Sequence, residues 1–249
     1  VTGRWITWKQ LVLSIGLLAV LVFLPLKAVG AESSVPLDHV EVDVKDQDSL
    51  QNGFKYYMSY CSSCHSLQYA RYERTANDLG IPNDVILDSV IFNEHQIGDL
   101  MENSMSTDNA KNWFGAAPPD LTLIGRVRSP EWLYTYLRTF YADSSRPWGV
   151  NNVVFPNVGM PNVLHELKGD VVCAGGDMAH CELEHVDGTG SMTPEEFDNT
   201  VADIVNFLYY IGEPVRAQRE YMGFFVLGFL AILFVFTSLL NREYWKKIH

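Results

Sequence analysis

The chain has 249 residues, of which 47% are hydrophobic and 12% aromatic, so it can bury the core of one large or two small domains. Its formal net charge is −12. This acidity argues against a nucleic-acid-binding protein, which needs a basic surface, and it favours attraction of a basic partner.

The first 31 residues have the pattern of a secretory signal. Arg4 and Lys9 precede an apolar run over residues 11–24, and small residues follow at Val29-Gly30-Ala31, the usual place of cleavage. We therefore predict that residues 1–31 are not part of the folded domain. A retained N-terminal membrane anchor is the alternative.

A helix is predicted to lead into the most informative motif of the chain. Asp48-Ser49 can cap this helix, and apolar residues from Leu50 to Cys61 recur at helical spacing. Gly53 inside it lowers the helix propensity, so we expect that another helix crosses closely there.

The motif itself is Cys61-Ser62-Ser63-Cys64-His65. C-x-x-C followed at once by histidine is typical of covalent haem attachment, in which each thiol adds to one vinyl group and the imidazole binds the iron. A redox C-x-x-C does not need the histidine, and a zinc site needs a second ligand pair. The motif therefore predicts one haem c, attached through Cys61 and Cys64 and ligated by His65.

Shorter helices are predicted over residues 83–91 and 130–141, the second with Ser129 as its cap. Residues 115–121 and 146–162 are rich in Pro, Gly and Asn and are expected to form structured loops. No run of alternating strands is evident. We expect a mostly α fold whose long loops surround the cofactor.

Two further segments close the chain. Thr193-Pro194-Glu195-Glu196 predicts a helix start with a capping box, and Gly212 and Pro214 predict its end. Met222 to Leu240 carries no charge and is long enough to cross a membrane, with aromatic residues at its far end.

The flanks of this apolar segment differ little in charge, so the signal sets the orientation. We expect an exported domain at residues 32–215, a transmembrane anchor at 216–241 and a cytoplasmic tail at 242–249.

Cys173 and Cys181 remain after haem attachment. In an oxidising compartment they predict a disulfide that closes a small loop. A metal site that also uses His180 and His185, or two reduced thiols, are the alternatives.

The expected sixth ligand of the iron is Met160, in the proline-flanked loop at residues 155–162. A thioether stabilises ferrous iron and raises the potential relative to a second imidazole. Most other methionines are better explained as core residues. The remaining candidates are His95, His165, His180 and His185.

In these motifs the chain resembles the cytochrome c1 family in its bacterial form. The matching segments occur in order over nearly the whole chain after the signal; they are residues 60–66, Arg71-Tyr72, 113–121, Arg126-Val127-Arg128, 146–152, 155–161 and the anchor that ends in residues 242–245. C-x-x-C-H alone would match any c-type cytochrome. The Pro118-Pro119-Asp120-Leu121 segment, the methionine loop and the C-terminal anchor are together much more specific.

The resemblance implies a haem domain like that of class I c-type cytochromes. The cofactor-binding residues that it implies are Cys61, Cys64, His65, Met160, Arg126 and Pro118. The guanidinium of Arg126 would pair with a haem propionate, with Arg128 as a second candidate, and Pro118 would lie against the haem edge. Trp113, Trp148 and Tyr72 are either pocket residues or ordinary buried aromatics.

The resemblance also implies the function of the haem subunit of quinol:cytochrome c oxidoreductase. Such a subunit passes single electrons from a Rieske iron–sulfur protein to a soluble or tethered cytochrome c, and quinol is oxidised elsewhere, so the chain has no catalytic residue of its own.

The implied partners are cytochrome b and the Rieske subunit, in a dimeric complex of the bacterial inner membrane with the haem domain in the periplasm. Two alternatives remain: a tethered cytochrome of a terminal oxidase or nitric oxide reductase, and a haem-based sensor with five-coordinate iron.

Overall fold

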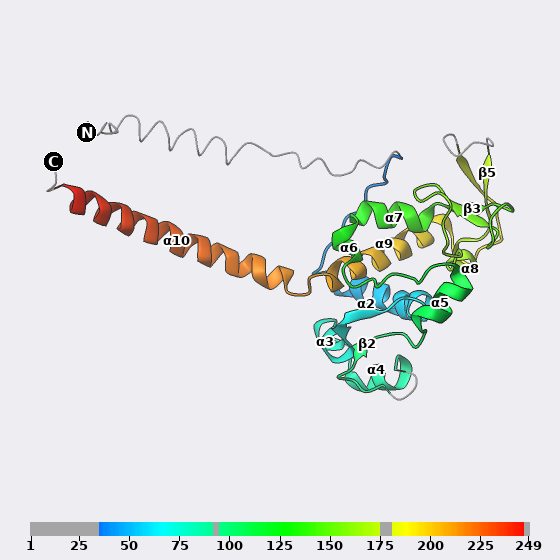
Figure 1. The fold of residues 1–249 in the computed structure, drawn as a ribbon, viewed down its shortest axis with the longest axis horizontal. Coiled ribbons are helices and arrows are strands. Elements are labelled where there is room, and N and C mark those ends of the chain that lie inside the picture. Colours follow the sequence, from blue (N-terminus) through cyan, green and yellow to red (C-terminus); the bar gives the residue numbers. More distant parts are fainter. Residues whose placement is uncertain (1–34, 92–94, 175–180, 247–249) are drawn as a thin grey trace. The chain divides into compact units, whose positions relative to one another are not determined.

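The computed structural model describes residues 35–91, 95–174 and 181–246 (Figure 1). The expected signal segment and His180 lie outside these ranges. The helices are α2 (Gln47–Tyr56), the π-helical turn η1 (Tyr57–Cys61), α3 (Tyr72–Asp78), α4 (Asn83–Ser89), α5 (Thr107–Phe114), α6 (Ile124–Val127), α7 (Pro130–Arg138), α8 (His165–Lys168), α9 (Pro194–Ile211) and α10 (Arg216–Trp245). The mostly α fold predicted from the sequence is confirmed.

Helices α2 and α9 pack side by side and form the centre of the domain (Figure 1). A Cβ atom at Gly53 would lie 2.0 Å from the carbonyl oxygen of Asp203, so only glycine fits at this crossing. The rings of Phe54 and Phe207 lie 5.5 Å apart beside it. The close crossing expected at Gly53 is therefore confirmed, and it fixes the helix that leads into the cysteine motif.

Helix α9 begins and ends where the sequence predicts. The hydroxyl of Thr193 accepts a hydrogen bond from the backbone N–H of Glu196 at 3.3 Å, and the Glu196 carboxylate accepts one from the Thr193 backbone N–H at 2.8 Å. This reciprocal pair is a capping box. The helix then buries one apolar face, which includes Val201, Ile204 and Phe207.

The start of α2 differs from the prediction. Its cap is Asp46, whose carboxylate accepts a hydrogen bond from the backbone N–H of Ser49 at 3.1 Å. Ser49 lies inside the helix, and its hydroxyl donates to the Asp203 carboxylate at 2.7 Å. The prediction of Asp48-Ser49 as the cap is wrong, because a contact with α9 uses the serine hydroxyl. The wider turn η1 then carries the chain to Cys61, and such turns are frequent at functional sites.

Three short antiparallel strand pairs complete the domain: β1 (Leu67–Arg71) with β2 (Leu100–Met101), β3 (Phe140–Ala142) with β4 (Val150–Asn152), and β5 (Val171–Ala174) with β6 (Glu182–His185). These strands have two to five residues, too few for alternation to reveal them. Pairing of β3 with β4 explains why α7 stops at Arg138, before the predicted end at residue 141. It also places a strand inside the loop predicted at 146–162.

Helix α10 is uncharged on all sides from Met222 to Leu240. Its mean hydropathy reaches 2.5 over an 18-residue window, and none of its residues is buried in the protein. A soluble helix would bury such a surface, so α10 is a transmembrane helix. It extends four residues beyond the predicted end of the anchor, to Trp245.

Candidate haem site

The cysteine motif closes a tight turn at the end of η1. The backbone N–H groups of Cys64 and His65 both donate to the carbonyl oxygen of Cys61, at 3.1 and 2.9 Å. Both cysteines are half-buried free thiols. Burial raises the pKa of the Cys61 thiol to about 12, so the thiol is neutral at physiological pH. The turn therefore presents two thiols and an imidazole from one short segment, as covalent haem attachment requires.

The imidazole of His65 is held in one orientation. Its Nδ1 donates to the carbonyl oxygen of Pro119 at 2.7 Å, which leaves Nε2 to bind a metal. Burial lowers the pKa of His65 although the contact with Pro119 opposes the shift, so the neutral form that binds iron is favoured. The hydroxyl of Tyr57 donates to the His65 carbonyl at 2.6 Å and fixes the backbone of the motif.

The segment that follows Pro118 is attached to the motif. The Asp120 carboxylate accepts hydrogen bonds from the backbone N–H groups of Gln68 at 2.8 Å and Thr122 at 2.9 Å. The backbone N–H of Leu121 donates to the Ser66 carbonyl at 2.9 Å. Pro118 directly precedes Pro119, whose carbonyl oxygen accepts the hydrogen bond from His65. The Pro-Pro-Asp-Leu segment and the cysteine motif are therefore joined by several hydrogen bonds.

Met160 lies in the loop before α8, and its sulfur has a polar neighbour. The hydroxyl of Tyr136 in α7 donates to the Met160 Sδ at 3.4 Å. The ring of Tyr136 stacks on Trp132 with centroids 4.9 Å apart, and Trp132 in turn meets Phe155 at 6.5 Å. Burial raises the pKa of Tyr136, so its hydroxyl remains a donor. Sequence reasoning missed Tyr136, because a tyrosine on an amphipathic helix has no signal that separates it from a core aromatic.

A short loop links the methionine loop to His65. A Cβ at Gly159, next to Met160, would lie 3.8 Å from the carbonyl oxygen of Phe114 at the end of α5. Five residues later, Pro119 contacts His65. Five residues span at most about 17 Å, so this loop brings the two expected ligands into one neighbourhood. Two free thiols, an imidazole with a free nitrogen and a thioether are the donor set that a haem c needs.

Other candidate ligands have different surroundings. Met101 is buried, and its sulfur accepts a hydrogen bond from the Thr75 hydroxyl at 3.7 Å. With His95 and Met105 it lines a cavity of about 410 Å³ that borders on Ser62 and Ser63 of the motif. His165 is half-exposed and pairs with Asp170 at 2.8 Å. None of these residues shares the contacts that join Met160 to α7.

The two candidate arginines have different partners. Arg126 forms an ion pair with Glu213, which follows the end of α9, and its stem lies against Gly212. Arg128 instead lies over the ring of Trp132, 4.8 Å from the centroid. Trp132 stacks on Tyr136, the residue that contacts Met160. Arg128 is therefore linked to the methionine loop through these contacts, although both arginines also line a groove at the start of α10.

The aromatic residues considered for the pocket divide into two groups. Tyr72 is buried in the core. Trp113 is 60% exposed and Trp148 45% exposed, so neither is an ordinary buried aromatic residue. The ring of Phe114 lies 5.6 Å from Trp148, beside the methionine loop. Large apolar side chains left exposed at this place indicate a surface that a cofactor or a partner covers.

Cys173 lies in β5, and Cys181 directly precedes β6 at the loop end of the hairpin that these strands form. The structure joins them by a disulfide, with their Cα atoms 5.2 Å apart. In the part of the chain that the structure describes, no group of three His, Cys, Asp or Glu residues could hold a metal ion.

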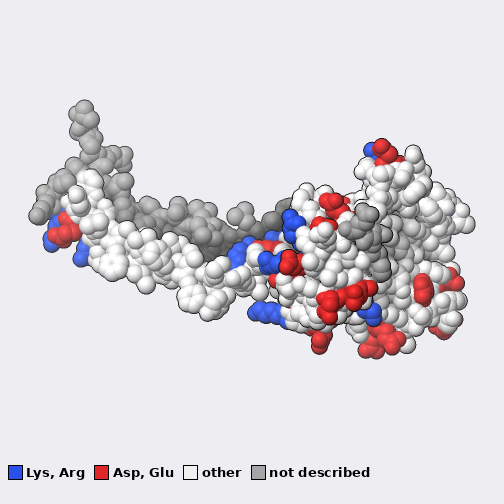
Figure 2. Space-filling view, turned by 90° about the horizontal axis from the view of Figure 1, so that it is seen from below, with Lys and Arg blue, Asp and Glu red and all other residues white. Residues whose placement is uncertain are grey.

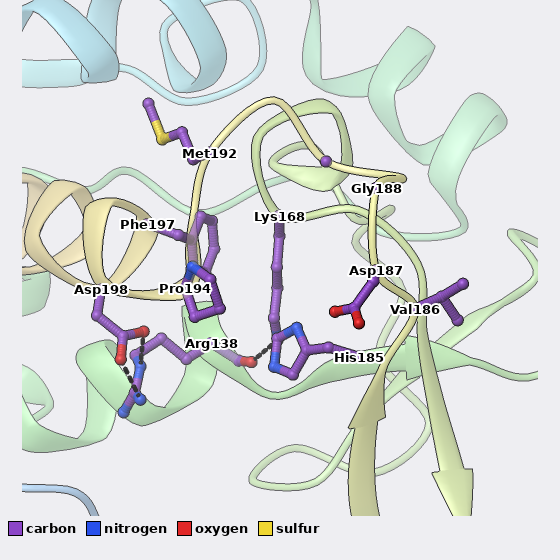
Figure 3. A pocket seen from close by; sticks show the side chains of 11 residues that line it. Arg138, Lys168, His185, Val186, Asp187, Gly188, Met192, Pro194, Phe197 and Asp198 are labelled. Carbon is purple, nitrogen blue, oxygen red and sulfur yellow. Dashed lines mark hydrogen bonds and ion pairs between the residues drawn. The ribbon is translucent and has the colours of Figure 1, made fainter.

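A separate cavity of about 290 Å³ lies between this hairpin and the start of α9 (Figure 3). The Arg138 guanidinium donates to both carboxylate oxygens of Asp198, at 2.6 and 2.7 Å. The ammonium of Lys168 donates to the carbonyl oxygen of Arg138, and burial lowers the pKa of Lys168 to about 8. His185, one of the alternative ligand candidates, lines this cavity, but Cys61, Cys64, His65 and Met160 do not.

Comparison with known proteins identifies the family. The model of the cytochrome C1 family matches residues 40–248. The chain belongs to this family. It is 48% identical to the cytochrome c1 of Allochromatium vinosum, over 86% of this chain and 90% of that protein.

Two other relatives are informative. A Nitrosomonas europaea protein named ammonia monooxygenase gamma subunit is 42% identical over 94% of this chain and 97% of its own length. The cytochrome c1 of Rhodospirillum rubrum is 26% identical over 82% of this chain. A solved chain of a hyperthermophilic respiratory complex III aligns with 98% of this chain at 18% identity and a TM-score of 0.45, too low a similarity to support an argument.

Family membership confirms the main predictions from the sequence. The chain carries one covalently attached haem c and is the electron-transfer haem subunit of quinol:cytochrome c oxidoreductase. It is anchored in the membrane by α10, and its partners are the cytochrome b and Rieske subunits.

Proposed function

We propose that this chain takes single electrons from the Rieske iron–sulfur protein and passes them to a soluble or tethered cytochrome c. The bound haem supplies the one-electron couple. The observation that carries the proposal is the link between His65 and the Met160 loop through residues 114–119. This link favours an iron with a protein ligand on each side. Such an iron transfers electrons and has no vacant coordination position for a substrate. The chain is thus redox-active only as part of a larger enzyme.

The protein's own residues would hold the cofactor and set its environment. Cys61 and Cys64 would carry the thioether bonds, and His65 and Met160 would be the axial ligands. The contact with Pro119 keeps the His65 Nδ1 protonated, so Nε2 would be free to bind the iron and the imidazole would be a stronger ligand. The Tyr136 hydroxyl would keep the Met160 sulfur in place.

We assign the propionate contact to Arg128 rather than Arg126. Arg126 forms an ion pair with Glu213, whereas Arg128 has no carboxylate partner among the described ion pairs and lies on Trp132, next to the residue that contacts Met160. A guanidinium stacked on an aromatic ring is preorganised to accept a carboxylate. We expect R128Q to lower the haem potential and R126Q to leave it nearly unchanged. The reverse order, measured by redox titration, would return the role to Arg126.

Pro118 would lie against the haem edge, because Pro119 beside it is bonded to the ligand His65. A bulky polar residue in its place would admit water to this edge. P118E should therefore change the potential without loss of covalent haem.

The haem domain would lie in the periplasm of a bacterium and residues 242–249 in the cytoplasm, within a dimeric complex. Asp and Glu are spread over the face of the domain in Figure 2, whereas Lys and Arg gather where α10 begins. The net charge of −12 would speed the approach of a basic acceptor cytochrome. Electron transfer to such an acceptor should slow as salt is added.

A second candidate function has the same haem chemistry but belongs to a different enzyme. The relative named ammonia monooxygenase gamma subunit is almost as similar to this chain as the first cytochrome c1. A tethered haem subunit of another respiratory enzyme would have the same motif and anchor. A haem-based sensor is disfavoured, because it would not need the contacts that hold Met160 in place.

Purification of the tagged full chain in mild detergent tests the proposal. We expect cytochrome b and the Rieske subunit to copurify, and added quinol to reduce the haem of the purified complex. Subunits of another oxidoreductase would support the second candidate. Rapid carbon monoxide binding to the reduced chain would mean an open iron and would contradict the proposed pair of axial ligands.

A further inference from the structure

The start of α10 carries a concentration of arginines that electron transfer does not explain. Four arginines, Arg126, Arg128, Arg216 and Arg219, line one groove of about 390 Å³, with Tyr209 as part of its wall. Figure 2 shows Lys and Arg gathered in the region where α10 begins. A basic groove on a chain with a net charge of −12 implies a specific acidic ligand.

The groove has a surplus of positive charge. Glu213 contacts both Arg126 and Arg219, the latter at 2.7 Å, and Glu220 pairs with Arg216 at 2.8 Å. Four guanidinium groups thus share two carboxylates, which leaves a surplus of two positive charges. Each guanidinium has five N–H donors, so an ion pair through one nitrogen leaves donors for a further acceptor.

The guanidinium groups are also preorganised. Arg216 lies over the ring of Tyr209 at 5.0 Å, and Glu213, whose side chain is only 15% exposed, holds Arg126 and Arg219 together. Side chains that are already ordered lose less conformational freedom when a ligand binds.

The depth of the groove relative to the membrane identifies the ligand. The apolar stretch begins at Met222, three residues after Arg219 and six after Arg216. At about 1.5 Å per residue, these arginines lie about 4.5 and 9 Å above the hydrocarbon. Each polar headgroup layer is about 5–7 Å thick. Arg219 is therefore at the level of lipid phosphates, and Arg216 at their outer edge.

We propose that the groove formed by Arg126, Arg216 and Arg219 binds the phosphate of an anionic phospholipid in the leaflet next to the haem domain. A phosphodiester supplies negative charge to this positively charged groove, and planar guanidinium groups match its oxygens. The acyl chains of this lipid would lie along the apolar surface of α10. The proposal is independent of the electron acceptor and rests only on α10 crossing the membrane.

Native mass spectrometry of the full haem-loaded chain tests this, with detergent micelles that contain phosphatidylglycerol or phosphatidylcholine. We expect one phosphatidylglycerol to be retained per chain, and R216Q/R219Q to bind it about thirtyfold more weakly. The control R74Q/K55Q removes two positive charges elsewhere: Arg74 pairs with Asp78 four residues on, as Arg216 does with Glu220, and Lys55 is exposed. This control should bind as the wild type does.

Several results would overturn the proposal. Equal retention of both lipids by the wild type would do so, whatever the variants show. So would equal binding of phosphatidylglycerol by R216Q/R219Q and the control. Displacement of the lipid by millimolar inorganic phosphate would indicate a general anion site instead. In the purified complex, crosslinking of the groove to an acidic segment of a partner subunit would assign it to a protein.

Discussion

Replacement of Gly53 by alanine tests whether the crossing of α2 and α9 supports the haem site. The added Cβ would lie 2.0 Å from the Asp203 oxygen, 2.7 Å from its carbonyl carbon and 2.8 Å from the Phe207 Cβ. Two of these atoms belong to the backbone, so no side-chain rotation relieves the clash. The two helices must separate by about 1 Å or more to restore ordinary contact, and a well-packed core resists such movement.

The expected loss of stability follows from these contacts. Overpacking costs about 1–3 kcal/mol. The Asp203 carboxylate would also lose hydrogen bonds from Ser49 at 2.7 Å and Asn52 at 2.6 Å, and bonds to a charged group contribute about 1.5–3 kcal/mol each. Alanine offsets about 1 kcal/mol of this loss, because its helix propensity is higher than that of glycine. We expect a net loss of at least about 3 kcal/mol in the free energy of unfolding, which corresponds to at least about 6–12 °C in melting temperature.

Denaturant unfolding of the haem-loaded chain, followed by circular dichroism, measures this loss. G98A is the matched control, because Gly98 has no atom within 4 Å of an added Cβ and no positive φ. It should differ from the wild type by less than about 0.5 kcal/mol. If G53A were as stable as G98A, the close crossing would not exist in solution, and helix packing would not be the reason for a glycine at this position.

The remaining predictions concern the haem ligands, the hairpin and a buried lysine. M160L should lower the haem potential strongly while covalent haem remains; an unchanged potential in redox titration would reject this ligand. Y136F should lower the potential by only about 20–40 mV, the equivalent of part of one hydrogen bond, and no change would mean that its hydroxyl does not reach the sulfur. C173S should lower the melting temperature without loss of haem, and mass analysis that finds free thiols in the native protein would contradict it. Lys168 has a folded pKa of about 8, below about 10.4 when unfolded, so the unfolded state binds more protons between these values. The free energy of unfolding should therefore rise with pH across that window, and K168M should remove this rise; the same slope in both proteins would refute it.

Local patterns in the sequence determined the parts of this protein that depend on neighbouring residues. Residue spacing within the C-x-x-C-H motif was enough to predict haem attachment. The helix start at Thr193 could be predicted from Pro194 and Glu196 alone. The anchor depends on the composition of one continuous segment. Gly53 indicated a helix crossing because glycine inside a helix has a local cost that only packing explains.

Tertiary structure decided which distant groups meet. Asp46 rather than Ser49 caps α2, because Asp203, from α9, uses the serine hydroxyl. The contact of Tyr136 with Met160 crosses from α7 to a loop 24 residues later. Glu213 forms an ion pair with Arg126, whereas Arg128 lies over the ring of Trp132.

The short strands depended on tertiary structure in the same way, since each pair forms only when its two segments are brought together. Sequence periodicity reports which face of a segment is apolar, but it does not report what that face will contact. Long-range pairing is set by the whole chain, and for that reason the motif and the anchor could be identified from the sequence alone, whereas the surroundings of the haem ligands could not.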